Sequence, residues 1–395
     1  MSNFYTHLGV LDQTWLDCRE IVVYGLGVMA LKSMESLRRD FEIPFIIDND
    51  PKKAGTHYAG IPILTLEQAR EKLPGKKIVI ASTYGVSRAI AKTLDAIGFR
   101  EALDYCALDL FAAEWYWHNR REVHLVEVHT TITEQCTFNC KNCNMFMPYF
   151  ESPRHLSVRE LTDDFDLFFA RVDWVSGFGL LGGEPFLHPE LYEILTHLCG
   201  RYAGRIGEIS IITNGTIVPD QQLLELMARH NVRVHISDYS KAVPYAEKQA
   251  QVVRALMDSG VDYRVNESLV WTDFGFPDHP WRLSKEQAAA HMQSCAPVFR
   301  GLNSGRLYFC HVVWAAQRCG LYEPAGADSL CLAAIDPSSD ADRRALLEYS
   351  LGSMAGGSLS FCKFCGGCGS DNRNFVQPAI QAPRGVQMHI KEAGR

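Results

Sequence analysis

Three cysteines lie within eight residues of this chain, at Cys136, Cys140 and Cys143. A loop this short can surround one small metal centre. Three thiolates on a cubane iron–sulfur cluster leave one iron atom without a protein ligand, and an open metal position is where chemistry takes place. The same spacing also suits a zinc site or three buried thiols, so the three cysteines alone do not decide the metal.

The segments around these cysteines predict how they are positioned. Residues 125–133 have the composition of a strand, which places the cysteine loop at a strand's carboxyl end, where barrel and open α/β enzymes keep their sites. From about residue 123 to 290, predicted strands and helices alternate, as in a parallel barrel. The next predicted strand, 175–181, ends in the compact turn Gly182-Gly183-Glu184-Pro185.

The C-x3-C-x2-C spacing and the Gly-Gly-Glu-Pro turn together resemble the radical S-adenosylmethionine (radical SAM) superfamily. The resemblance implies a [4Fe–4S] cluster on Cys136, Cys140 and Cys143, whose open iron binds the amino and carboxylate groups of SAM. It also implies reductive cleavage of SAM to a 5′-deoxyadenosyl radical, which takes a hydrogen atom from a substrate. Asn142 departs from the family, which usually has an aromatic residue before the third cysteine. That change weakens one packing contact and leaves the ligand set intact.

The resemblance further implies residues that hold SAM. In the family, the glycine backbone and the glutamate of the turn hold the SAM amino group, and polar residues at later strand ends contact the ribose or carboxylate. Such residues also occur as ordinary hydrogen-bonded strand ends, and no catalytic acid or base is assigned. The expected SAM-binding set is Gly182, Gly183, Glu184, Thr213, Asn214 and Ser237.

A second group of cysteines lies near the carboxyl end of the chain. Cys295 is followed by nine residues, a glycine, four residues and Cys310, and Cys362 and Cys365 come later. This pattern resembles the SPASM and twitch extensions of radical SAM enzymes, which hold auxiliary iron–sulfur clusters. Four thiolates suffice for one fully ligated [4Fe–4S] cluster, so the single-cluster twitch form fits better. Cys368 is an alternative to Cys365, and four cysteines also suit zinc.

The N-terminal region carries a different motif. Gly25-x-Gly27-x-x-Ala30 follows a predicted strand, and Asp48 ends the next one, as in dinucleotide-binding folds. In such folds the glycines let a phosphate approach the helix N-terminus, and the acidic side chain accepts a hydrogen bond from a ribose or sugar hydroxyl. Residues 18–105 also resemble the small N-terminal domain of sugar O-acyltransferases, which implies a nucleotide or nucleotide-sugar. A Rossmann-like fold with an empty pocket is the alternative.

Composition narrows the class of protein. The 395 residues carry a formal charge of −7 and no block of Lys and Arg, which argues against nucleic-acid binding. No apolar stretch is long enough for a membrane span, and the N-terminus does not have the pattern of a signal peptide. Thirteen cysteines in a chain expected to be cytoplasmic favour metal binding over disulfides. An electron donor such as flavodoxin or ferredoxin is the expected protein partner.

The sequence therefore predicts an α/β enzyme in four parts: a Rossmann-like domain (1–110), a linker helix (111–122), a partial (β/α)6 radical SAM barrel (123–290) and a twitch-like extension (291–395). The preferred substrate is a sugar, nucleotide-sugar or related polyol that is oxidised or epimerised. The alternatives are a peptide-modifying SPASM-type maturase and a non-catalytic iron–sulfur binding protein. The Gly-Gly-Glu-Pro turn argues against the last, since a protein that only binds a cluster has no need to hold SAM.

Overall fold

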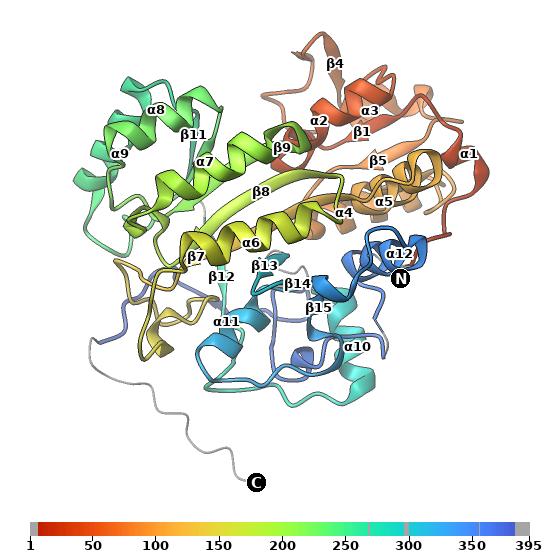
Figure 1. Ribbon diagram of the computed structural model, residues 1–395. Coiled ribbons are helices and arrows are strands. Elements are labelled where there is room, and N and C mark those ends of the chain that lie inside the picture. The colour runs from red at the N-terminus through yellow and green to blue at the C-terminus, as the bar shows by residue number, and fades with distance from the viewer. Residues whose placement is uncertain (1–6, 268, 296–299, 355, 384–395) are drawn as a thin grey trace. The chain divides into compact units, whose positions relative to one another are not determined.

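A computed structural model describes residues 7–267, 269–295, 300–354 and 356–383 (Figure 1). By its internal contacts the chain divides into two compact units. The first unit comprises residues 1–126, 172–177 and 337–353, and the second comprises 127–171, 178–336 and 354–395. Residues 1–6, where no signal peptide is expected, lie outside the described residues. The four-part domain division stays a prediction.

The first unit contains a six-stranded sheet in the order β3-β4-β2-β1-β5-β6. All pairings are parallel except that of β3 with β4. The central strands are continuous apolar runs, because a parallel sheet covered on both faces buries every side chain. The strands are β1 (Val22–Tyr24), β2 (Ile46–Ile47), β3 (His57–Tyr58), β4 (Ile61–Leu64), β5 (Ile78–Ile80) and β6 (Tyr105–Ala107), and the helices are α1 (Gln13–Leu16), α2 (Val28–Asp40), α3 (Leu66–Ala69), α4 (Tyr84–Ala96), α5 (Leu108–Arg120) and α12 (Asp340–Ser350).

The region expected to be a linker helix differs in detail from the expectation. Tyr105–Ala107 forms strand β6 beside β5, and helix α5 follows directly. The aromatic side chains of α5 are buried within the first unit: Trp115 packs edge-on against Phe41, and Tyr116 stacks on His124. These large aromatic contacts give α5 a place in the core of that unit.

The second unit is built on most of an eight-stranded sheet in the order β11-β10-β9-β8-β7-β13-β14-β15. Strands β9, β10 and β11 are parallel, β13 is parallel to β7, and β14 and β15 continue antiparallel. This mixed α/β arrangement is consistent with a partial radical SAM barrel. The strands are β7 (His124–Thr133), β8 (Trp174–Gly182), β9 (Ile206–Thr213), β10 (Arg233–Ser237), β11 (Tyr263–Asn266), β13 (Gly301–Asn303), β14 (Arg306–Tyr308) and β15 (Leu330–Cys331), with β12 (Trp271–Thr272) and β16 (Phe375–Val376) as a separate pair.

Local sequence signals explain how the helices of this unit begin. Helix α6 starts behind Ser157, whose side chain and that of Glu160 form a capping box. Asp164 on α6 accepts the backbone N–H groups of Ser304 and Gly305 and so fixes the β13–β14 hairpin. The helices are α6 (Val158–Phe169), α7 (Leu191–Tyr202), α8 (Gln221–Arg229), α9 (Ala246–Asp258), α10 (Lys285–Ser294) and α11 (Val312–Arg318).

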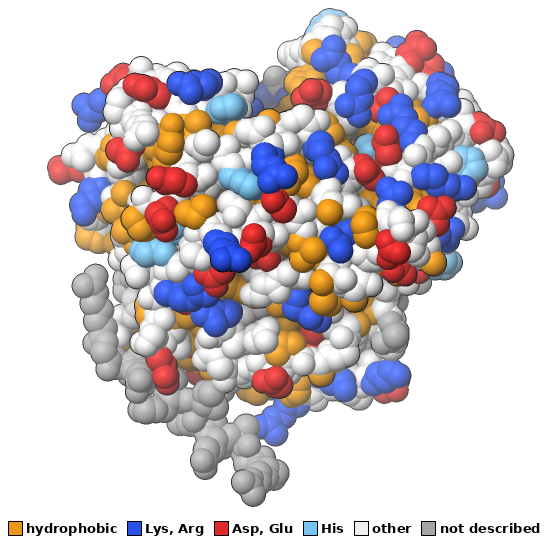
Figure 2. Space-filling model, viewed as in Figure 1, with side chains coloured by type: hydrophobic (Ala, Val, Ile, Leu, Met, Phe, Trp, Pro, Cys, Tyr) orange, Lys and Arg blue, Asp and Glu red, His pale blue; other side chains and the backbone are white. Residues whose placement is uncertain are grey.

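The helices and the surface charges bear on the predicted class of protein. None of the described helices is long and apolar enough to cross a membrane. On the face shown in Figure 2, Lys and Arg side chains are interspersed with Asp and Glu rather than gathered in one patch.

Candidate metal and cofactor site

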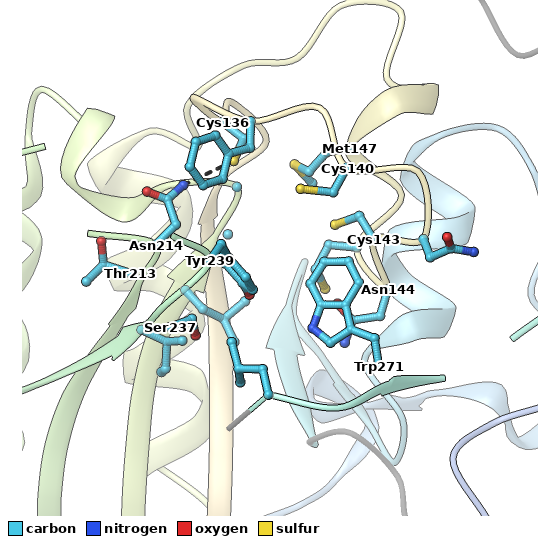
Figure 3. Close-up of a pocket in the computed structure, with 18 of the residues that line it drawn as sticks. Cys136, Cys140, Cys143, Asn144, Met147, Thr213, Asn214, Ser237, Tyr239 and Trp271 are labelled. Atoms are coloured by element: carbon cyan, nitrogen blue, oxygen red, sulfur yellow. Dashed lines mark hydrogen bonds between the residues drawn. The ribbon is translucent and has the colours of Figure 1, made fainter. Parts of the chain in front are cut away.

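A cavity of about 570 Å³ lies in the second unit, where β7, β8, β9 and β10 end (Figure 3). The cysteine loop follows β7, the glycine turn follows β8, and the polar strand ends belong to β9 and β10. The fold thus brings together most of the residues that the sequence singled out. Those lining the cavity are Cys136, Cys140, Cys143, Gly182, Gly183, Thr213, Asn214 and Ser237.

The three thiols of the loop suit a metal centre by their chemistry. Burial, and after it the neighbouring Cys143, raises the pKa of Cys140 to about 12. Burial also raises the pKa of Cys136 and of Cys143. Thiols whose pKa is raised stay protonated unless a cation replaces their protons, as iron does when it binds thiolates. The residues therefore fit a cluster held by this loop.

Amide groups are aimed at two of these sulfur atoms. Asn214 Nδ2 lies 3.7 Å from Cys136 Sγ, and Gln381 Nε2 lies 3.3 Å from Cys140 Sγ. Gln381 also accepts the backbone N–H of Asn139 through Oε1. N–H groups directed at cluster sulfurs are one of the means by which a protein tunes an iron–sulfur centre.

The glycine turn lies against the loop so closely that larger residues would not fit. A Cβ at Gly182 would overlap the carbonyl oxygen of Thr133, and one at Gly183 would overlap that of Gln135. The Gly183 Cβ would also lie 2.8 Å from Cys136 Cβ. Both glycines are therefore required for the close approach of turn and loop.

Gly183→Ala is expected to displace the cysteine loop. We expect it to cost about 1–3 kcal/mol of unfolding free energy, as overpacking does, and to lower iron retention after reconstitution. Gly200→Ala on α7 is the matched control, because a Cβ there meets nothing within 4 Å. Thermal unfolding and iron assays of both variants test this; equal iron content would show that the loop tolerates the methyl group.

Glu184 is buried beside the cavity and is already hydrogen-bonded. Its carboxylate accepts from Thr213 Oγ1 at 2.7 Å, from the backbone N–H of Asn214 at 2.8 Å and from that of Phe186 at 3.1 Å. Burial raises its pKa to about 7, against the lowering effect of these bonds. In this structure Glu184 thus joins the glycine turn to the end of β9, and its contact with the SAM ammonium stays a prediction.

The carboxyl-terminal cysteines surround a second, smaller cavity of about 30 Å³. It is lined by Cys295, Cys310, Cys362, Cys365 and Cys368. Burial raises the pKa of Cys362 and Cys365 well above the ordinary value, and the other thiols add to this. The pKa of Cys295 is raised first by its hydrogen bond with Cys368 and then by burial. The four predicted ligands therefore come together with a fifth thiol.

Cys368 lines both cavities, so the choice between Cys365 and Cys368 as a ligand stays open. Cys365 Sγ accepts the backbone N–H of Gly367 at 3.3 Å. Within the described ranges, no three His, Cys, Asp or Glu side chains are placed to share a single metal ion. None of the thirteen cysteines, all of which are described, forms a disulfide.

The N-terminal glycine turn lies in the first unit. Gly25 has a positive φ of 93°, and a Cβ there would overlap Ser82 Oγ, whereas a Cβ on Gly27 would meet open space. Asp48 accepts the backbone N–H of Leu26 at 2.8 Å and pairs with Lys53 at 3.0 Å. Asp48 therefore stabilises the glycine turn through its hydrogen bond with Leu26. Its contact with a sugar hydroxyl stays a prediction.

Several residues at the cavity escaped the sequence analysis. Gln381 reaches the cysteine loop from a segment more than two hundred residues later in the chain, and no local pattern marks it. Trp271 lines the cavity from strand β12, and Tyr239 lines it from the loop after β10. Glu127 and His129 also line it. Residues 125–133 were predicted to form a strand, and residues two apart in a strand lie on the same face. That spacing was the sequence signal that Glu127 and His129 lie together.

Comparison with known proteins agrees with this geometry. Residues 130–237, which include the three-cysteine loop, the glycine turn and the ends of β9 and β10, match the Radical SAM superfamily. Residues 130–237 are thus similar in sequence to a radical SAM domain. The chain is 30% identical over 99 residues to GTP 3′,8-cyclase 1 of Mycobacterium tuberculosis, covering 24% of this chain and 27% of that protein. It is 27% identical over 161 residues to AlbA, the antilisterial bacteriocin subtilosin biosynthesis protein of Bacillus subtilis, covering 36% and 33%.

The chain spans about a quarter to a third of the length of these curated relatives. Among solved structures, SuiB of Streptococcus suis bound to S-adenosylmethionine aligns over 41% of this chain and 34% of its own, with 15% identity and a TM-score of 0.29. BtrN in complex with AdoMet and 2-DOIA aligns over 40% and 64%, with 15% identity and a TM-score of 0.27.

Proposed function

We propose that this chain is a radical SAM enzyme with two iron–sulfur clusters. The first would be held by Cys136, Cys140 and Cys143, and the second by Cys295, Cys310, Cys362 and Cys365, with Cys368 as the alternative fourth ligand. The observation that carries the proposal is the single cavity shared by the cysteine loop, the glycine turn and the polar ends of β9 and β10. When bound, the first cluster with SAM supplies a carbon-centred radical able to take hydrogen from an unactivated C–H bond.

The protein's own residues would bind, orient and shield the reactants. The backbone of Gly182 and Gly183 and the side chains of Thr213, Asn214 and Ser237 are proposed to hold SAM. Asn214 and Gln381 would stabilise the thiolate sulfurs through their N–H groups. Aromatic side chains of the cavity, including Tyr239 and Trp271, would exclude water from the reacting atoms.

For the substrate we propose a peptide. The support is the similarity to AlbA, a bacteriocin biosynthesis protein, over 161 residues. This choice reverses the preference drawn from the sequence, in which a sugar came first. An electron donor such as flavodoxin or ferredoxin is the proposed partner.

The test is a substrate screen. The anaerobically reconstituted full-length chain would be incubated with SAM, dithionite and either a synthetic decapeptide library or a pool of sugars, amino sugars, polyols and UDP-, GDP- and CDP-sugars. Peptide-dependent stimulation of 5′-deoxyadenosine formation is the expected result. Stimulation by the sugar pool alone would reject the peptide, and absence of SAM cleavage would reject the enzyme.

A sugar or nucleotide-sugar is the second candidate. It is favoured by the parallel sheet of the first unit, whose Gly25 and Gly27 turn follows β1 beside the open space at Gly27. If this turn binds a phosphate, Gly27→Val should weaken calorimetric binding of UDP-, GDP- or CDP-sugars at least tenfold by filling that space. The control is Gly85→Ala, because a Cβ at Gly85 also meets open space. Gly60→Ala is unsuitable as a control, because Gly60 has a positive φ. No binding by the wild-type chain would leave the first unit without this role.

A further inference from the structure

Two polar side chains on β7 line the cavity and have no place in the proposed cofactor set. Glu127 and His129 are two residues apart and so share one face of the strand. Glu127 Oε1 lies 3.4 Å from His129 Nε2. The strand continues from His129 to Thr133 before the cysteine loop begins, which is roughly 13 Å of extended chain. The pair therefore lies deeper along β7 than the loop.

The neighbouring strand makes room for this pair. A Cβ at Gly179 on β8 would lie 2.8 Å from His129 Nε2 and 2.9 Å from Ile212 Cδ1, so the imidazole fits only because that residue is glycine. The side chains of Glu127 and His129 are 20% and 10% exposed. Both side chains are thus largely buried, and the part of each that stays accessible faces the cavity.

The chemistry of the pair selects what it can bind. A carboxylate in a partly dehydrated cavity attracts hydrogen-bond donors, and strongly so when the donor is charged. It repels a phosphate or another carboxylate by the same electrostatics. The imidazole beside it can donate to the carboxylate or accept from the bound group. A hydroxyl or ammonium group therefore suits this place.

We propose that Glu127 and His129 form the specificity-determining site that receives a hydroxyl or ammonium group of the substrate. The inference rests on the proposed function, because it assumes that substrate enters the cavity that holds SAM. Such a group belongs equally to a Ser, Thr or Lys side chain of a peptide and to a sugar or amino sugar. The pair thus defines the chemistry of the reacting segment under either substrate class.

Affinity selection followed by mass spectrometry tests the proposal by binding rather than turnover. The reconstituted chain with S-adenosylhomocysteine would be mixed with a decapeptide library and its phosphoserine counterpart, or with amino sugars and polyols and their phosphates. We expect the wild type to retain unphosphorylated members of one arm, and the arm identifies the source. Glu127→Gln should weaken retention about ten- to a hundredfold, the effect of losing a charge-assisted hydrogen bond.

Matched controls separate recognition from folding. His129→Gln should weaken retention of the same compounds, whereas Glu225→Gln and His230→Gln, at helix α8, should not. Iron content and circular dichroism verify that each variant is folded. Equal retention by Glu127→Gln and the wild type, preference for phosphorylated members, or no retention by the wild type would each overturn the inference. Loss of SAM cleavage in the wild type would instead reject the proposed function.

Discussion

Replacing Cys136, Cys140 and Cys143 together by alanine is expected to abolish SAM cleavage and to remove about half of the bound iron. Two cubane clusters account for about eight iron atoms, four in each. The substitution removes the proposed ligands of one cluster and leaves the cysteines around the second cavity in place. Iron analysis and quantification of 5′-deoxyadenosine after anaerobic reconstitution measure both effects.

The matched control replaces three cysteines that line neither of these cavities. Cys18, Cys106 and Cys199 are the control set, and the triple alanine variant is expected to keep its iron and its SAM cleavage. If iron fell to zero in the Cys136/Cys140/Cys143 variant, or if the wild type bound only zinc, the two-cluster proposal would be wrong.

Replacing Cys295 and Cys310 by alanine is expected to stop product formation while 5′-deoxyadenosine formation stays measurable. The two residues line the second cavity with Cys362 and Cys365, and their loss leaves too few thiolates for a fully ligated cluster. SAM cleavage needs only the open-iron cluster, whereas a substrate oxidation needs an electron acceptor as well. Parallel assays of 5′-deoxyadenosine and of product, with a substrate found in the screen, separate the two activities.

Cys331→Ala is the control for this variant, because Cys331 lies on β15 and lines neither cavity. It should behave as the wild type does. A folded Cys295/Cys310 variant that still made full product would assign the second cluster a structural role. The electron-acceptor role proposed for the second cluster would then be rejected.

Much of the site was predictable because its signals are local in the sequence. The cysteine loop follows strand β7, and the glycine turn lies at the end of strand β8. The amino-acid composition of each strand is enough to predict it. Carboxyl ends of neighbouring strands meet at one edge of a sheet, so these residues converge without further information. The strands that precede the cysteine loop and the glycine turn were predicted for the same reason.

Contacts between distant segments were not predictable in this way. Gln381 reaches Cys140 across 241 residues of sequence, and no periodic pattern announces such a contact. The inward position of Glu184 depends on donors from Thr213 and Asn214, which another strand supplies. In each case a partner elsewhere in the fold decides where the side chain points.

The most direct test of the central claim is the paramagnetic resonance spectrum of the dithionite-reduced Cys295/Cys310 variant, recorded with and without SAM. This variant isolates the cluster proposed at Cys136, Cys140 and Cys143. We expect a reduced [4Fe–4S] signal that changes when SAM binds the open iron, and the loss of that signal when the three cysteines are also replaced. A spectrum that SAM leaves unchanged, or a preparation without a reducible cluster, would contradict this expectation.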